Sequence, residues 1–119
     1  VSHAGLYDLR SQWTTSDVVY GRERNIGGPA WESIPLWREQ SPFYRSEKLR
    51  TPILLTYGAN DFRVPLNNGL EFWTVLQRQD VPSRLVVFPD ENHWVLKGEN
   101  SRYFYQEVHG WLAKYLATQ

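Results

Sequence analysis

The chain has 119 residues, enough for one small domain, and its 13 basic and 13 acidic residues give a formal net charge of zero. This balance argues against binding to nucleic acid or to a membrane surface, and no apolar run approaches the roughly 18 residues of a membrane span. Cysteine is absent, which excludes disulfides, thiolate nucleophiles and cysteine-ligated zinc but leaves the cellular compartment open.

Residues 1–50 are rich in Trp, Arg, Gly and Pro and predict an irregular segment with short helices. One helix is expected after a threonine cap at 14–15, with Asp17 in its first turn, and should end near Arg24. Another is expected after a cap at Ser33 and should stop at the Ser-Pro pair that follows it. This composition gives the segment few periodic apolar positions of its own.

Residues 51–119 predict a regular order of strand, helix, strand and helix. Pro52–Tyr57 is a continuous apolar run, typical of a parallel strand covered on both faces, and Leu85–Phe88 is a second such run. Apolar residues at helical spacing predict helices over about 65–79 and 100–117. Parallel strands joined by a helix form a β-α-β unit with a right-handed crossover, so the predicted fold class is α/β.

Two chemically informative residues follow the two predicted strands. Asp61 lies in the turn Gly58–Pro65 after the first strand, and His93 lies in the loop Asp90–His93 after the second. Ligands of such sheets bind beyond the carboxyl ends of the strands, and the two residues are about one β-α-β unit apart. We therefore expect the carboxylate to reach the imidazole, as the last two members of a Ser…Asp…His triad do in an α/β-hydrolase.

Asp61 and His93 fit two of the three roles in serine hydrolysis. A serine hydroxyl is a weak nucleophile at neutral pH and needs a base within hydrogen-bond reach. A histidine supplies that base, and a buried carboxylate fixes its tautomer and stabilises the imidazolium. No serine lies in a Gly-x-Ser-x-Gly setting, and the chain begins with Val1 and contains no Met. We therefore interpret it as a fragment or processed chain whose nucleophile lies upstream.

Five motifs spread over nearly the whole chain carry a family resemblance. The sequence resembles the prolyl oligopeptidase family of serine peptidases, which includes acylaminoacyl peptidases and dipeptidyl aminopeptidases. The motifs are specific together and weak singly. They are Val1-Ser2-His3-Ala4-Gly5-Leu6-Tyr7-Asp8, Ser41-Pro42, Thr51-Pro52-Ile53-Leu54-Leu55, Gly58-x-x-Asp61-x-Arg63-Val64-Pro65 and Phe88-Pro89-Asp90-Glu91-x-His93.

The resemblance implies the C-terminal part of a catalytic α/β-hydrolase domain and serine-type hydrolysis of peptide bonds in short peptides, with no cofactor. It implies that Asp61 is the triad aspartate and His93 the triad histidine. It also implies that Arg63 contacts a substrate carbonyl and that Val64 lines the pocket for the residue before the scissile bond. The family places its serine elbow and a β-propeller before the matched stretch, so the isolated chain is expected to be inactive.

Plainer roles remain open for three of these residues. Asp61 lies in a Gly-x-x-Asp turn, where an aspartate commonly bonds its own backbone. His93 on its own would be an ordinary histidine of a surface loop. Arg63 could form an ion pair with a nearby acid instead of contacting a substrate.

The other histidines and acids suggest no further site. Asp90 and Glu91 could join His93 in a metal site, but two adjacent carboxylates and one histidine are poor ligand spacing, so no metal is expected. His3 and His109 have no partner motif and are interpreted as structural.

Two other functions stay open beside the peptidase. One is an esterase of the same fold, although the turn Asp61–Pro65 favours the peptidase. The other is a non-catalytic piece that acts only as a folding or interaction module, which the absent nucleophile supports. The expected partners are a peptide substrate and either the remainder of the parent polypeptide or copies of the chain, because an unpaired strand edge should pair. The residues do not distinguish an exopeptidase from an endopeptidase.

Overall fold

The computed structural model describes residues 1–32 and 34–116. Its centre is a parallel three-stranded sheet in the order β1-β2-β3. The strands are β1 (Ser2–His3), β2 (Ile53–Gly58) and β3 (Ser83–Phe88). The helices are α1 (Leu9–Thr15), α2 (Val19–Ile26), α3 (Leu36–Glu39), α4 (Leu66–Arg78) and α5 (Gly98–Leu116), with 3₁₀ segments at η1 (Ala30–Glu32) and η2 (Pro42–Lys48).

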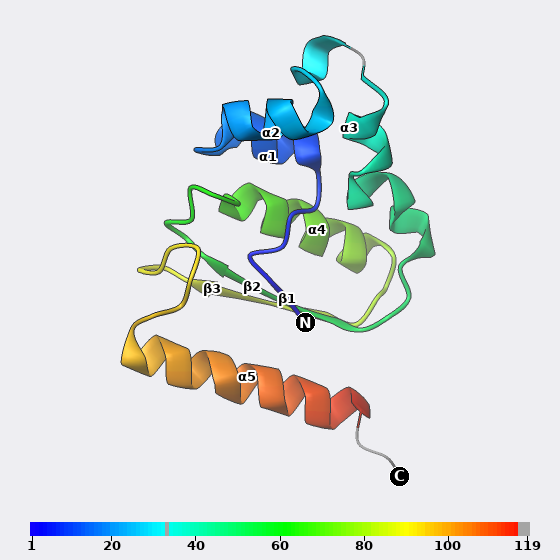
Figure 1. The fold of residues 1–119 in the computed structure, drawn as a ribbon. Coiled ribbons are helices and arrows are strands. Elements are labelled where there is room, and N and C mark those ends of the chain that lie inside the picture. Colours follow the sequence, from blue (N-terminus) through cyan, green and yellow to red (C-terminus); the bar gives the residue numbers. More distant parts are fainter. Residues whose placement is uncertain (33, 117–119) are drawn as a thin grey trace.

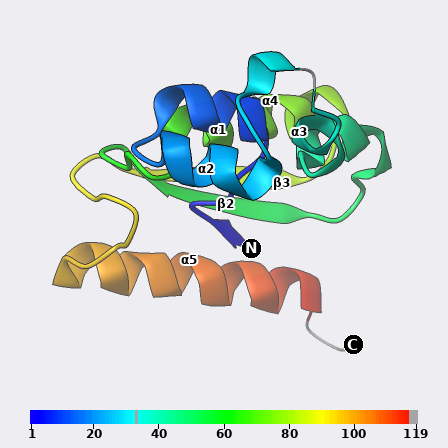
Figure 2. The ribbon, with the colours of Figure 1, turned by 45° about the horizontal axis from the view of Figure 1, so that its top comes forward.

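The sheet lies between two helical layers, as Figure 1 shows. Helices α1 to α4 cover one face, and α5 runs across the other, which is clearest in the turned view of Figure 2. This arrangement confirms the predicted α/β class with parallel strands and crossover helices. None of the helices in the described part of the chain is long and apolar enough to cross a membrane.

Strand β2 is buried on both of its faces. Leu54, Leu55 and Tyr57 are each 0% exposed, which explains why this strand is an unbroken apolar run rather than an alternating one. Burying a leucine side chain contributes about 1.5–3 kcal/mol, so the two leucines anchor the layers on opposite faces of the strand. The pairing of β2 with β3 runs in register up to Gly58 and Phe88, so the two strands end level with each other.

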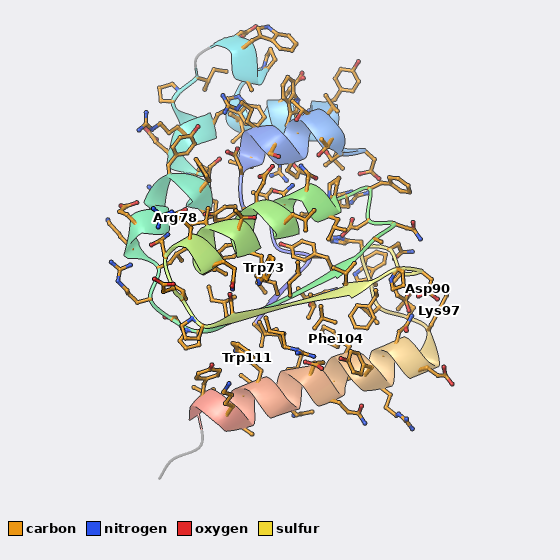
Figure 3. The ribbon with its side chains drawn as sticks, turned by 180° about the vertical axis from the view of Figure 1, so that it is seen from behind. Trp73, Arg78, Asp90, Lys97, Phe104 and Trp111 are labelled. Carbon is orange, nitrogen blue, oxygen red and sulfur yellow. The ribbon has the colours of Figure 1, made fainter. Side chains whose placement is uncertain are left out.

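Each face of the sheet has its own apolar core. On the α4 side the core consists of Leu55, Tyr57, Val64, Leu76 and Val81. On the α5 side it consists of Leu54, Val86 and Phe88, against which Val95, Phe104, Val108 and Trp111 pack. Figure 3 shows Phe104 and Trp111 pointing from α5 towards the sheet. The helical pattern of the last segment is therefore the pattern of its sheet-facing side.

The start of the chain differs from the sequence prediction. Helix α1 begins at Leu9, because the Asp8 carboxylate accepts hydrogen bonds from the backbone amides of Arg10, at 2.8 Å, and Ser11, at 3.4 Å. Residues 14–15, expected as a cap, instead close α1, and their hydroxyls donate to carbonyls one turn earlier. The prediction overlooked the earlier cap.

The second and third helices are closer to expectation. Helix α2 starts at Val19, so Asp17 lies in the loop before it and not in its first turn. The helix ends at Ile26 and is capped by Gly27, whose φ of 105° is the left-handed conformation that glycine adopts readily. Helix α3 ends before Gln40, as the sequence predicts, whereas the expected cap at Ser33 lies outside the described residues.

Candidate active site

The loops that follow β2 and β3 bring Asp61 and His93 together. Nδ1 of His93 lies 2.8 Å from Oδ2 of Asp61, which confirms the contact predicted from the level ends of two neighbouring parallel strands. The Asp61 side chain is 0% exposed and the His93 side chain 33% exposed. A buried carboxylate of this kind needs partners, and the imidazole is one of them. Because Nδ1 faces Asp61, Nε2 is the ring nitrogen available for proton exchange with a substrate or a nucleophile.

The two oxygens of Asp61 have separate tasks. Oδ1 accepts hydrogen bonds from the backbone amides of Arg63, at 2.8 Å, and Val64, at 2.9 Å. This is the local turn that an aspartate forms with its own backbone. Oδ2 is thereby left for His93. The plain turn role and the contact with the histidine coexist in one side chain.

Backbone contacts hold the Asp61 and His93 loops against each other. The amide of Ala59 donates to the carbonyl of Phe88 at 2.8 Å, and the amide of Asn60 donates to the carbonyl of Glu91 at 3.0 Å. At Gly58 a Cβ atom would lie only 2.1 Å from the carbonyl oxygen of Asn92. A glycine is therefore required here by the close approach of two backbones.

His3, in strand β1, supports the loop that carries His93. Its Nε2 lies 3.2 Å from the backbone carbonyl oxygen of His93, and its Nδ1 lies 2.9 Å from Oγ1 of Thr56. Burial lowers the pKa of His3 and favours its neutral form. The sequence interpretation of His3 as structural did not foresee this contact, although its position at the end of β1 was an available signal. His109 lies on the exposed surface of α5.

A hollow of about 190 Å³ opens beside the imidazole. Its lining comprises Asp17, Asn60, Asp61, Phe62, Arg63, Asn92, His93 and Trp94. Phe62 and Trp94 are 70% and 63% exposed, so the hollow has aromatic as well as charged walls. A larger hollow of about 510 Å³ lies among the first three helices, but its lining of Leu6, Leu9, Arg22, Asn25, Ile26, Leu36, Gln40 and Pro42 holds no nucleophile or base.

Arg63 is paired with Asp17 at the edge of the hollow. Its Nε donates to Oδ1 of Asp17 at 2.8 Å, and the backbone amide of Asp17 donates to the carbonyl of Phe62 at 2.8 Å. The guanidinium lowers the pKa of Asp17 below its ordinary value. The ion pair that the sequence left open for Arg63 is therefore present, and a contact of Arg63 with a substrate carbonyl stays a prediction.

Val64 lies in a different environment from the one the resemblance implies. Its side chain is 7% exposed and packs in the core beside Leu55, Tyr57 and Leu76. It is not among the described residues that line the hollow. In this structure Val64 packs beneath the turn that carries Asp61, because its amide is held by the Asp61 carboxylate and its side chain turns inward.

The acids before His93 serve the loop itself. Asp90 pairs with Lys97, and Figure 3 shows these two side chains next to each other near the start of α5. Glu91 accepts from the backbone amides of Leu96 and Lys97. Within residues 1–32 and 34–116, no three side chains of His, Asp or Glu are grouped closely enough to hold a metal ion.

Curated proteins with similar sequences are peptidases. The model of the prolyl oligopeptidase family matches residues 1–119. Dipeptidyl-peptidase 5 of Porphyromonas gingivalis is 33% identical over 98% of the chain, and dipeptidyl-peptidase 5 of Aspergillus oryzae is 37% identical over 100% of it. The chain spans 18% and 17% of the lengths of these two relatives. Their whole activity therefore involves much more polypeptide than the stretch compared.

Solved structures show the same fold. An acylaminoacyl peptidase of Pyrococcus horikoshii matches 95% of the chain with a TM-score of 0.86 at 20% identity. A puromycin-hydrolyzing peptidase of Mycobacterium tuberculosis matches 98% of it with a TM-score of 0.83 at 22% identity. The chain covers 19% and 18% of these two structures, respectively. The match of the family model over all 119 residues shows that the chain belongs to the prolyl oligopeptidase family.

Proposed function

We propose that the chain supplies the aspartate and the histidine of a Ser-Asp-His triad in a serine peptidase that acts on short peptides. The observation that carries the proposal is the 2.8 Å contact between His93 Nδ1 and Asp61 Oδ2 at the carboxyl edge of two neighbouring parallel strands. Membership of the prolyl oligopeptidase family and the similarity to dipeptidyl-peptidase 5 proteins support a peptide substrate.

In the proposed reaction, a serine hydroxyl contributed by an upstream segment attacks the scissile carbonyl carbon. Nε2 of His93 takes the hydroxyl proton as the new C–O bond forms, and later gives it to the departing amine as the C–N bond breaks. Asp61 Oδ2 accepts the hydrogen bond from His93 Nδ1–H and stabilises the imidazolium. A water molecule then attacks the acyl-enzyme and gives its proton to Nε2 of His93. The ester bond breaks, the serine oxygen takes that proton, and the carboxylic acid product leaves.

The walls of the hollow suggest how substrate is held. The Asp17 carboxylate engages Nε and Nη2 of Arg63, at 2.8 and 3.5 Å, on one side of the guanidinium. The other side retains donors that can bind a substrate carbonyl. We propose Arg63 for this contact, whereas the burial of Val64 favours a packing role over contact with the substrate.

The experiment uses the full-length polypeptide that carries this chain. Its kcat and KM are measured on a dipeptidyl nitroanilide and on a matched ester. Replacing the base, His93→Ala, should lower kcat about 10⁶-fold, and Asp61→Asn should lower it about 10⁴-fold. His109→Ala is the matched control, because this histidine is exposed on α5.

Three outcomes would contradict the proposal in different ways. Turnover of the ester without turnover of the amide would favour an esterase. No turnover of either substrate by the full-length protein would favour a non-catalytic module. Undiminished turnover by His93→Ala would remove His93 from the reaction.

A further inference from the structure

Glu91 is a buried acid that the proposed reaction does not use. It lies two positions before His93, and only 4% of the residue is exposed. Its Oε2 accepts the backbone amide of Leu96 at 3.1 Å, and its Oε1 accepts the backbone amide of Lys97 at 2.9 Å and the side-chain amide of Asn100 at 2.9 Å. The Glu91 carboxylate thus binds residues that follow His93 in the chain.

The backbone of Glu91 binds residues that precede it in the chain. Its carbonyl oxygen accepts the amide of Asn60 at 3.0 Å, directly before Asp61, and its own amide donates to the carbonyl of Phe88 at 3.4 Å. One residue therefore links the end of β3, the loop of the aspartate and the start of α5. His93 lies within the short segment that these contacts enclose.

The charge of Glu91 suits this position. Burial opposes ionisation, but hydrogen bonds from Asn100 and from the backbone amides of Leu96 and Lys97 outweigh it and lower the pKa of Glu91. Two of these donors directly precede Gly98, where α5 begins, and a helix N-terminus favours negative charge. A neutral side chain would weaken the interaction with all three donors.

We propose that Glu91 is a positioning residue whose ionised carboxylate fixes the loop so that His93 Nδ1 meets Asp61. The catalytic consequence rests on the proposed function, whereas the ordering of the loop does not. Asp90 is the alternative tether, because it contacts both Lys97 and Asn100. Its ion pair with Lys97 is about half exposed, and exposed pairs contribute little.

The test compares four variants of the full-length polypeptide. Glu91→Gln keeps the size of the side chain and removes the charge, and Asn100→Ala removes one of the three donors. Asp90→Asn is the matched control for the neighbouring exposed acid, and Glu99→Gln is the control for an exposed acid in the first turn of α5. Each variant is measured for Tm, for kcat and KM separately, and for the NMR signal of the His93 Nδ1 proton.

We expect Glu91→Gln to lower kcat about 10- to 100-fold with little change in KM, because small displacements of a catalytic group have effects of this size. The His93 Nδ1 proton should exchange faster with solvent and its signal should broaden. Asn100→Ala should produce the same changes to a smaller extent. Both control variants should behave as the unmodified protein does.

A lower Tm for Glu91→Gln with unchanged kcat and an unchanged His93 signal would overturn the proposal and leave Glu91 a purely structural role. Equal effects of Asp90→Asn and Glu91→Gln would also overturn it. If Glu91→Gln does not fold, Asn100→Ala is compared with Asp90→Asn by the same two readouts, because Asn100 also donates to Asp90; equal effects of these two variants would overturn the proposal. If the full-length protein hydrolyses no peptide, the proposed function fails, and the His93 signal still tests the positioning role.

Discussion

Nε2 of His3 lies 3.2 Å from the backbone carbonyl oxygen of His93, so the first strand of the sheet contacts the loop that carries the proposed catalytic base. A neutral His3 can donate from Nε2 to that carbonyl while Nδ1 accepts the hydroxyl of Thr56 at 2.9 Å. Protonation of His3 would put a hydrogen on Nδ1, which could then no longer accept the hydroxyl of Thr56. The contact therefore makes the loop sensitive to pH through a residue outside the proposed triad.

The first prediction concerns this pH dependence. Burial lowers the pKa of His3 in the folded state, so the unfolded chain takes up the proton first as the pH falls. The free energy of unfolding should therefore decrease from about pH 6.5, the ordinary pKa of histidine, down to the lowered pKa of the folded state. His3→Gln should flatten this part of the curve. Denaturant unfolding of the full-length protein between pH 5 and 8 measures it, with His109→Gln as the exposed control. An identical pH slope in His3→Gln would contradict the assignment.

The second prediction concerns Gly58. An alanine Cβ here would lie 2.1 Å from the carbonyl oxygen of Asn92, so Gly58→Ala should force the two loops apart. We expect a loss of about 1–3 kcal/mol in stability, as for other overpacked sites, and a fall in kcat of about 100-fold. Gly110→Ala is the control, since its added Cβ has no atom within 4 Å apart from its own helix backbone and chain neighbours, and alanine stabilises a helix by about 0.5–1 kcal/mol relative to glycine.

Calorimetry and nitroanilide turnover on the two glycine variants measure this difference. A Gly58→Ala protein with the Tm and kcat of the unmodified protein would show that the close approach is not required.

The third prediction separates two roles of Arg63. Its pair with Asp17 is about half exposed and should contribute little to folding. Arg63→Ala should therefore leave Tm nearly unchanged and lower kcat/KM about 10- to 100-fold, as expected for a lost hydrogen bond to a charged group. Steady-state kinetics and thermal unfolding of the full-length protein distinguish the roles. Unchanged kinetics with a large drop in Tm would assign Arg63 to structure.

The fourth prediction concerns assembly, which we propose from the strand edges. In the described part of the chain, β1 pairs with β2 alone and has no strand on its outer side. An unpaired parallel edge offers free backbone donors and acceptors. The isolated 119-residue chain should therefore associate with copies of itself, or be stable only when packed against the rest of its polypeptide.

Analytical ultracentrifugation at micromolar concentration tests this proposal. A monodisperse species of 14.0 kDa that melts cooperatively and binds no hydrophobic dye would contradict it.

The pairing of Asp61 with His93 was predictable because it follows from topology. An apolar run too continuous for an exposed strand predicts a doubly covered β2, and parallel neighbours present their following loops at one edge. The pairing of Arg63 with Asp17 was not predictable, since it joins residues 46 positions apart through loops without a repeating pattern. The sequence prediction placed Asp17 inside the second helix, because it began that helix too early. In the structure α2 begins at Val19, and Asp17 lies in the loop before it, where it pairs with Arg63.

Competing local signals explain the other differences. Asp8 and the threonines at 14–15 are both good caps, and the aspartate caps α1 while Leu9 and Trp13 are buried in the helical core. Glu91 was weighed as a metal ligand, although an acid shortly before an amphipathic helix also predicts contacts with the amides at its start. The inward turn of Val64 depends on packing with Leu76 and Val81, which no motif specifies.

The most direct test of the proposed triad is the rate at which a serine-directed fluorophosphonate labels the full-length protein. Labelling needs a serine activated by His93, with Asp61 holding the imidazole at 2.8 Å. We predict stoichiometric labelling of a single serine upstream of this chain, a rate at least about 10³-fold lower in His93→Ala and Asp61→Asn, and no labelling of the isolated 119-residue chain. Labelling at the same rate in the unmodified protein and in His93→Ala would contradict the account.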